Sequence, residues 1–160
     1  MTEDLLPFDA GVADYTAQAE LLLSGHRTGE SRALKTIHEN HPRFLDAETK
    51  WLPLRLEEDE IAAAPFDEAD ARLALARWYC FRDWEALVAF AEAVGHRESD
   101  VFRFESAVEA VISGDVERLR ALLHDDPRLV HARSTRVTKF DPAHHQSMLL
   151  HYVAANGVEG

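Results

Sequence analysis

The fold of this chain follows from a stretch that occurs twice. The first copy reads Gly29-Glu30-Ser31-Arg32-Ala33-Leu34-Lys35-Thr36-Ile37, and the second, 85 residues later, reads Gly114-Asp115-Val116-Glu117-Arg118-Leu119-Arg120-Ala121-Leu122. Each begins with glycine and has apolar residues at two matching positions. Each continues to Pro-Arg and two apolar residues, at 42–45 and 127–130. We predict that each copy is a helix entered through a tight glycine turn and closed by its proline.

The rest of the chain has the same kind of pattern. Apolar residues recur at helical spacing through most of it, and the alternation typical of strands is nearly absent. Helices this short cannot bury an apolar stripe alone, so they must stack on neighbours. The expected fold class is therefore all-α, made of stacked antiparallel helix pairs. The stripes lie within residues 15–23, 34–37, 73–79, 84–94, 104–112 and 116–123.

Composition excludes several classes of function. The 160 residues include 29 acids and 17 bases, a net charge of −12. Proteins that bind nucleic acids or anionic membranes do so through clustered Lys and Arg, so we predict neither as a partner. The apolar runs fall far short of the ~18 residues that span a bilayer, and the acidic start Met1-Thr2-Glu3-Asp4 is unlike a secretory signal. One cysteine allows no internal disulfide, so we expect a cytoplasmic location.

The negative charge is concentrated in the first half. Residues 1–70 hold 16 acids and 6 bases, a net charge of −10, whereas residues 71–160 hold 13 acids and 11 bases, a net charge of −2. The densest run is Glu57-Glu58-Asp59-Glu60. Carboxylates suit the positive end of a helix dipole, so the run is interpreted as a solvated helix start. An acidic docking site is the alternative.

The end of the chain contains a more specific motif. It reads Met148-Leu149-Leu150-His151-Tyr152-Val153-Ala154-Ala155-Asn156-Gly157. This stretch resembles the ankyrin repeat, whose helix-opening signature is T-P-L-H-x-A. Leu150 and His151 match its Leu-His pair, and Ala154 matches the second residue of the usual Ala-Ala pair. Asn156-Gly157 resembles the turn between the two helices of a repeat.

An earlier stretch, residues 104–133, resembles a degenerate repeat of the same family. Its turn would lie at Gly114-Asp115, and its second helix would follow. In ankyrin repeats the motif histidine is structural, so the resemblance implies that His151 hydrogen-bonds to a neighbouring unit and ties the repeats together. The resemblance assigns structural roles to five residues: Gly114, Leu150, His151, Ala154 and Gly157.

The middle of the chain is also similar to part of a known architecture. Residues 70–87 resemble a helix-turn-helix element that precedes ankyrin repeats in a group of bacterial proteins. Cys80 stands where that element usually has glycine, so a left-handed turn there would be strained. The resemblance implies an ankyrin-like α-solenoid in two parts. A helical N-terminal extension covers residues 1–100, with the helix-turn-helix element at 67–95, and ankyrin-like repeats cover residues 101–160.

The last of these repeats is incomplete, because the chain stops where its second helix should begin. We expect a C-terminally truncated member of the group. The helix that lacks its pair would expose Leu149, Tyr152 and Val153, and this bare apolar face could drive self-association.

The family resemblance also implies a function, which is non-catalytic protein–protein interaction. The locally basic stretch 133–140 lengthens the connection between the two repeats, and arginine and phenylalanine are typical interface anchors. A merely solvated insertion is the alternative. The other protein that would bind here is not identified by the sequence. The candidate partner-binding residues are Arg133, Arg136, Lys139, Phe140, His144 and His145.

Catalytic interpretations are weaker. Asp141, His144 and His145 could hold a divalent metal in a metal-dependent or small-molecule enzyme, but no four-ligand spacing is present. The run His38-Glu39-Asn40-His41 lacks the spacing of a metalloprotease helix, and Cys80 has no nearby histidine to act as its base. We therefore predict no catalytic residue, no metal and no cofactor. A third hypothesis is an N-terminal capping or regulatory segment of a longer repeat protein.

Overall fold

The computed structural model describes residues 5–137 and 146–156, and within these ranges the regular structure is entirely helical. The predicted all-α class is therefore confirmed. Leu45 and Pro53 form an isolated antiparallel β-bridge outside any strand. Within the described residues, no helix has the length and apolarity needed to cross a bilayer. The elements are α1 (Val12–Thr28), α2 (Ser31–Asn40), η1 (Pro42–Phe44), α3 (Glu58–Ala63), α4 (Glu68–Trp78), α5 (Trp84–Val94), α6 (Asp100–Ser113), α7 (Val116–Asp125), η2 (Pro127–Val130) and α8 (Leu149–Asn156).

The two predicted glycine turns are present and have the same geometry. Gly29 ends α1 with φ 69°, and Gly114 ends α6 with φ 71°, both in the left-handed region. In each turn the amide after the glycine donates to a carbonyl five residues back, from Glu30 to Gly25 at 2.8 Å and from Asp115 to Ala110 at 2.9 Å. This bond is the mark of a Schellman motif, which satisfies a carbonyl at the end of the helix.

The turn between α4 and α5 repeats this geometry without a glycine. Cys80 has φ 65°, the only positive value at a non-glycine position among the described residues. The amide of Phe81 donates to the carbonyl of Ala76 at 2.8 Å, as in the two glycine turns. A side chain in this backbone region costs about 1–2 kcal/mol. The doubt that the sequence raised about Cys80 is thus resolved in favour of a strained left-handed turn.

The internal repeat also extends past the helices. A short 3-10 helix follows α2 and another follows α7, and each has its proline in the first turn. The side chain before the proline caps each one. The ring of His41 accepts from the amide of Arg43, and the carboxylate of Asp126 accepts from the amide of Arg128. Glycine turn, helix and proline-led 3-10 helix are therefore one structural unit that occurs twice.

The acidic run begins a helix, as the dipole argument predicts. The N-cap of α3 is Glu57, and the side chain of Glu60 accepts from the backbone amide of Glu57 at 2.9 Å. Only one α3 residue, Ile61, is buried. The acidic side chains of this short helix are exposed, so the alternative of a docking role stays open.

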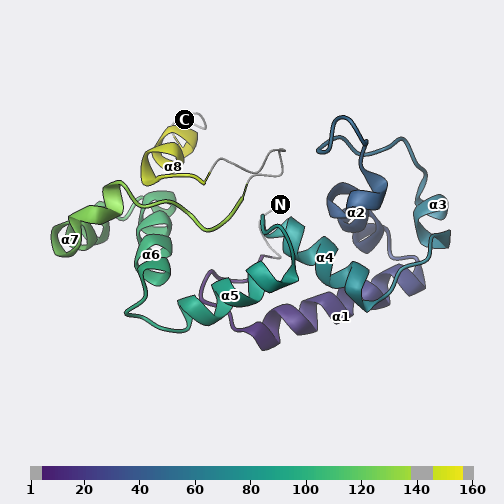
Figure 1. Ribbon diagram of the computed structural model, residues 1–160, viewed down its shortest axis with the longest axis horizontal. Helices are drawn as coiled ribbons and strands as arrows, with labels where there is room; N and C mark the ends of the chain where they lie inside the picture. Colours follow the sequence, from purple (N-terminus) through teal and green to yellow (C-terminus); the bar gives the residue numbers. More distant parts are fainter. Residues whose placement is uncertain (1–4, 138–145, 157–160) are drawn as a thin grey trace.

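Buried apolar side chains form two clusters. The first lies among α1, α2, α4 and α5, and the second joins α6, η2 and α8 and includes Phe104, Val108 and Leu149. The helix α6 takes part in both, because Phe102 near its start packs on the first cluster. Figure 1 shows α7 and α8 at one end of the molecule and α2 and α3 at the other. The predicted division after residue 100 stays a prediction.

Gly114 offers a direct test of the repeated turn. Nothing lies within 4 Å of a Cβ built on Gly114, so a substitution there would cost backbone strain and not a clash. We expect Gly114→Val to lower the free energy of unfolding by about 1 kcal/mol or more, measured by urea denaturation. Gly114→Asn is the matched control, since asparagine tolerates this region, and it should lose much less. Equal stability of the valine variant and the unmodified chain would contradict the assignment.

Candidate functional site

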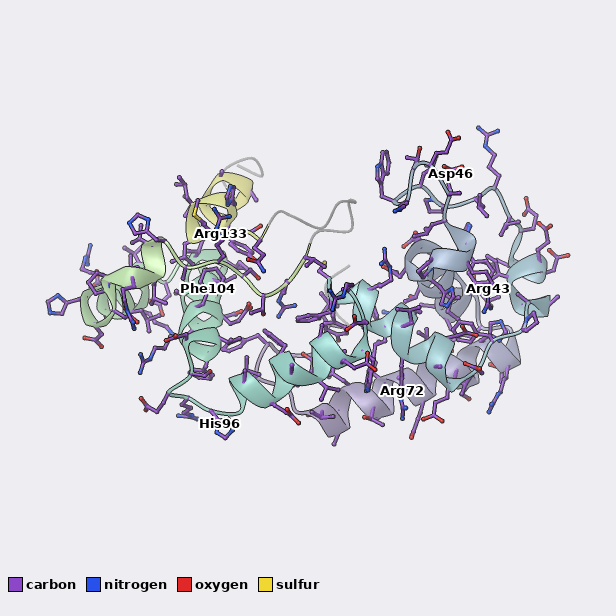
Figure 2. All side chains as sticks on the ribbon, viewed as in Figure 1. Arg43, Asp46, Arg72, His96, Phe104 and Arg133 are labelled. Carbon is purple, nitrogen blue, oxygen red and sulfur yellow. The ribbon has the colours of Figure 1, made fainter. Side chains whose placement is uncertain are left out.

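The insertion between η2 and α8 is closed at its base. The amide of Ser134 donates to the carbonyl of Ser147 at 2.8 Å, and the guanidinium of Arg133 donates to the carbonyl of Gln146 at 3.2 Å. We call residues 134–147 the clamped loop, because its two ends are held side by side. Arg133 lies at the α6–α8 end of the molecule (Figure 2). The base of the loop is therefore fixed.

Arg136 leaves this base and points into the protein. Its guanidinium stacks over the rings of Phe90, at 4.7 Å to the ring centre, and Phe81, at 5.5 Å. It also donates to the carboxylate of Glu105 at 3.4 Å and to the carbonyl of Tyr79 at 3.5 Å. Only 24% of its side chain is exposed. One side chain thus contacts α5, α6 and the turn between α4 and α5.

The backbone around Arg136 is held as well. The amide of Val137 donates to the carbonyl of Cys80 at 2.7 Å, and the amide of Arg136 donates to the hydroxyl of Ser134 at 3.1 Å. Tyr152 of α8 hydrogen-bonds to the side chain of Ser134. We call residues 133–137 the strap, since this segment ties the C-terminal unit to the α4–α5 turn.

The site contains a buried carboxylate. Glu105 is 4% exposed, and its Oε1 makes no hydrogen bond within the described residues. Burial raises the pKa of Glu105, and the charge and hydrogen bond of Arg136 act in the opposite direction. Arg136 is therefore the cation that makes the buried Glu105 tolerable.

The hydroxyl of Tyr15 is also buried without a hydrogen-bond partner among the described residues, and burial raises the pKa of Tyr15 to about 12.

The candidate partner-binding residues are placed differently from one another. Arg133 is exposed at the neck of the loop, whereas Arg136 is used inside the fold. A residue that only binds a partner would be dispensable for folding, and the contacts of Arg136 inside the protein predict that it is not. Lys139, Phe140, Asp141, His144 and His145 lie outside the described residues.

The ankyrin-like motif residues are distributed over α8. Leu150 is 70% exposed, and Ala154 is exposed as well. The ring of His151 accepts a hydrogen bond from the amide of Met148 at 2.9 Å, which closes the first turn of its own helix. Gly114 forms the turn described above, and Gly157 lies outside the described residues.

The exposed face of α8 differs from the one expected. Leu149 is buried in the second cluster and Tyr152 packs against it, so neither forms a bare face. The exposed apolar side chains of this helix are Leu150 and Val153, at 70% and 48%. Leu149 and Tyr152, three residues apart, lie on one side of α8, and this side packs against α6 and η2. The expected exposure of these two residues was therefore wrong.

Within the part of the chain that the structure describes, no three His, Cys, Asp or Glu side chains come together in a way that could hold a metal ion. His38 donates through Nε2 to the carbonyl of Leu54 at 2.7 Å. His41 is buried and lies with Nε2 3.1 Å from the carboxylate of Asp70, so the two histidines have separate structural partners. Burial lowers the pKa of His41, while the nearby negative charge of Asp70 opposes that shift.

Sequence reasoning missed the inner partners of the strap. Glu105 lies next to Phe104 and three residues before Val108 in an apolar helical stripe. A carboxylate in such a stripe is rarely fully buried unless it is paired. That rule could have flagged Glu105 as needing a cation, although nothing local in the sequence identifies Arg136 as the one.

Comparison with known proteins adds no relative. No family model matches the chain, and no curated protein or solved structure matches it. The site must therefore be interpreted from its own contacts.

The Arg136 contacts predict a loss of stability on truncation. Arg136→Ala leaves Glu105 buried without its cation and removes the stacking on two phenylalanines. We expect the free energy of unfolding at pH 7.5 to fall by about 2 kcal/mol, measured by urea denaturation. Arg118→Ala, which removes an exposed guanidinium from α7, is the control and should change stability by less than about 0.5 kcal/mol.

The same variant should show a distinctive pH dependence. Without Arg136, the pKa of Glu105 in the folded state rises further above its unfolded value. The folded state then binds more protons than the unfolded state between the two pKa values, so stability falls as pH rises through that window. The deficit of Arg136→Ala should shrink between pH 7.5 and pH 5, and Glu105→Gln in the Arg136→Ala background should remove this dependence. A deficit that does not change with pH would contradict the pairing.

Proposed function

We propose that this chain is a non-catalytic protein–protein interaction module of the ankyrin-repeat type, with the clamped loop as its contact element. The observation that supports this most directly is the fixed base of the loop. Two bonds close the neck, and Arg136 and Val137 anchor the strap beside it. A loop held at its base loses less entropy on binding than a free one, which is how rigid scaffolds present contact residues.

The ankyrin-like solenoid is part of this proposal. The helices within each of three pairs, α1–α2, α4–α5 and α6–α7, are joined by a turn of the same geometry. The first pair packs on the second, and the second packs on the third through α5 and α6. Such an arrangement presents extended surfaces and not a deep preorganised pocket.

The partner in this proposal is another protein in the cytoplasm. The net charge of −12 disfavours nucleic acid and anionic membranes. Self-association is a further part of the proposal, through Leu150 and Val153 on the outer face of α8. These two residues lie three apart, so their side chains share one side of the helix.

The test is affinity capture from a lysate of the native host, followed by mass spectrometry. We expect the double variant Lys139→Ala/Phe140→Ala to retain a specific set of proteins at least fivefold less than the unmodified chain. Arg118→Ala/Arg120→Ala, which removes charges from the exposed side of α7, is the control and should retain that set unchanged. Equal retention by the loop variant would reject the clamped loop as the contact element.

A further inference from the structure

We propose that His41 is a pH-sensitive cap, which holds residues 42–54 in place while its ring is neutral and releases them when the ring is protonated. We call residues 42–54 the capped segment, and it consists of η1 and the turn that follows. This inference goes beyond the proposed function and does not depend on it, because it concerns the response of the fold itself to pH.

Both ring nitrogens of His41 are in use. Nδ1 accepts a hydrogen bond from the amide of Arg43 at 3.2 Å, so this nitrogen carries no proton. Nε2 therefore carries the proton of the neutral ring and donates to the carboxylate of Asp70 at 3.1 Å. A second proton can bind only at Nδ1, where it would face the N–H of Arg43. Protonation of His41 therefore removes the side-chain hydrogen bond that caps η1.

The surroundings of His41 disfavour a positive charge on its ring. The residue is only 4% exposed. The oxygen of Asp70 that accepts from His41 also accepts from the guanidinium of Arg43 at 3.1 Å, so this carboxylate already has a permanent cation. Arg77 of α4 adds further positive charge. A charged His41 would therefore be one more cation in a buried cluster whose single carboxylate is already paired.

These groups determine the direction of the pH response. Burial lowers the pKa of His41, Asp70 opposes that shift, and Arg43 and Arg77 add to it. When the capped segment is released, the ring is solvated and its pKa returns to the ordinary value of 6.5. The released state then binds more protons than the capped state. The segment is therefore held firmly above about pH 6.5 and is released progressively as the pH falls toward the lower pKa of the capped state.

Backbone hydrogen bonds connect the cap to the turn that follows η1. The amide of Phe44 donates to the carbonyl of His41 at 3.0 Å, and the amide of Leu54 donates to the carbonyl of Phe44 at 2.8 Å. A displaced η1 therefore loses the bond that closes the turn. Figure 2 shows Asp46, which lies in this turn, at the edge of the molecule beyond α2. Protonation of one buried ring thus changes the surface at this end of the protein.

The second copy of the repeated unit has a cap that does not respond in this way. Asp126 occupies the place of His41, and its carboxylate accepts from the amide of Arg128 at 3.1 Å. The hydrogen bond from the Arg128 guanidinium keeps the pKa of Asp126 below its ordinary value. This carboxylate therefore stays an acceptor at a pH where His41 has lost that ability. One chain contains a pH-sensitive copy of the unit and an insensitive one.

Two other histidines lie near the capped segment, and protonation breaks neither of their hydrogen bonds. His38 of α2 donates through Nε2 to the carbonyl of Leu54 at 2.7 Å. His26 of α1 contacts the ring of Phe66, as His41 does, and hydrogen-bonds through Nε2 to a backbone carbonyl of α3. A carbonyl accepts from Nε2 whether the imidazole is neutral or charged. His41 is therefore the histidine whose protonation removes a bond of the segment.

The test is an NMR titration of the 15N-labelled full chain from pH 7.5 to pH 4.5. We expect the ring of His41 to carry its proton on Nε2 at pH 7.5 and to titrate with a midpoint below 6.5. The amide resonances of Arg43 and Leu54 should move with the same midpoint, and the heteronuclear NOEs of the capped segment should fall. The amide of Arg128 is the internal control, and its resonance should move at least threefold less.

Two variants assign the response to His41. His41→Asn keeps an oxygen that can accept from the amide of Arg43 but cannot titrate, so the response of Arg43 should disappear. His38→Gln is the matched control on the same helix and should keep the response. An Arg43 amide that does not follow the titration of His41, a response that persists in His41→Asn, or an equal response at Arg128 would each overturn the inference. If His41→Asn does not fold, the comparison of Arg43 with Arg128 in the unmodified chain still decides.

Discussion

The structure depends most on the contacts by which Arg136 joins the C-terminal segment to α5, α6 and the α4–α5 turn. Two apolar clusters share a single helix, α6, and the strap crosses from the second to the α4–α5 turn. There the guanidinium stacks on Phe81 and Phe90 and meets the buried Glu105. The buried charge of Glu105 needs a cation beside it, so detachment of the strap would lower the stability of the fold. This makes the base of the clamped loop part of the fold.

Local sequence signals were enough to predict the helices and the repeated unit. Gly29 and Gly114 mark their turns because glycine accepts a left-handed backbone without strain, and Pro42 and Pro127 mark the ends because proline cannot continue a helix. The all-α class followed from helical spacing. The Cys80 turn shows that packing can impose the same geometry on a residue that resists it.

The candidate site was less predictable because its contacts are between residues far apart in the sequence. Arg136 and Glu105 are 31 residues apart, and the local pattern identifies Arg136 only as part of a basic stretch. The prediction of which α8 residues are exposed was wrong for Leu149 for a similar reason. Leu149 is buried because it packs against α6 and η2, and the pattern within its own helix does not show this. The turn at residues 45–54 was not predicted because it is built from backbone hydrogen bonds and the Asp46 side chain, without helical or strand periodicity.

Together these features describe a helical body to which the strap is joined by Arg136 and Val137. The central claim is that the strap is a fixed part of this body. Hydrogen–deuterium exchange of the unmodified chain tests it most directly, at the amide of Val137, which donates to Cys80, and the amide of Ser134, which donates to Ser147. We predict that both exchange as slowly as the amides of α4 and α5. Exchange of these two amides at the rate of an unstructured peptide would contradict the account.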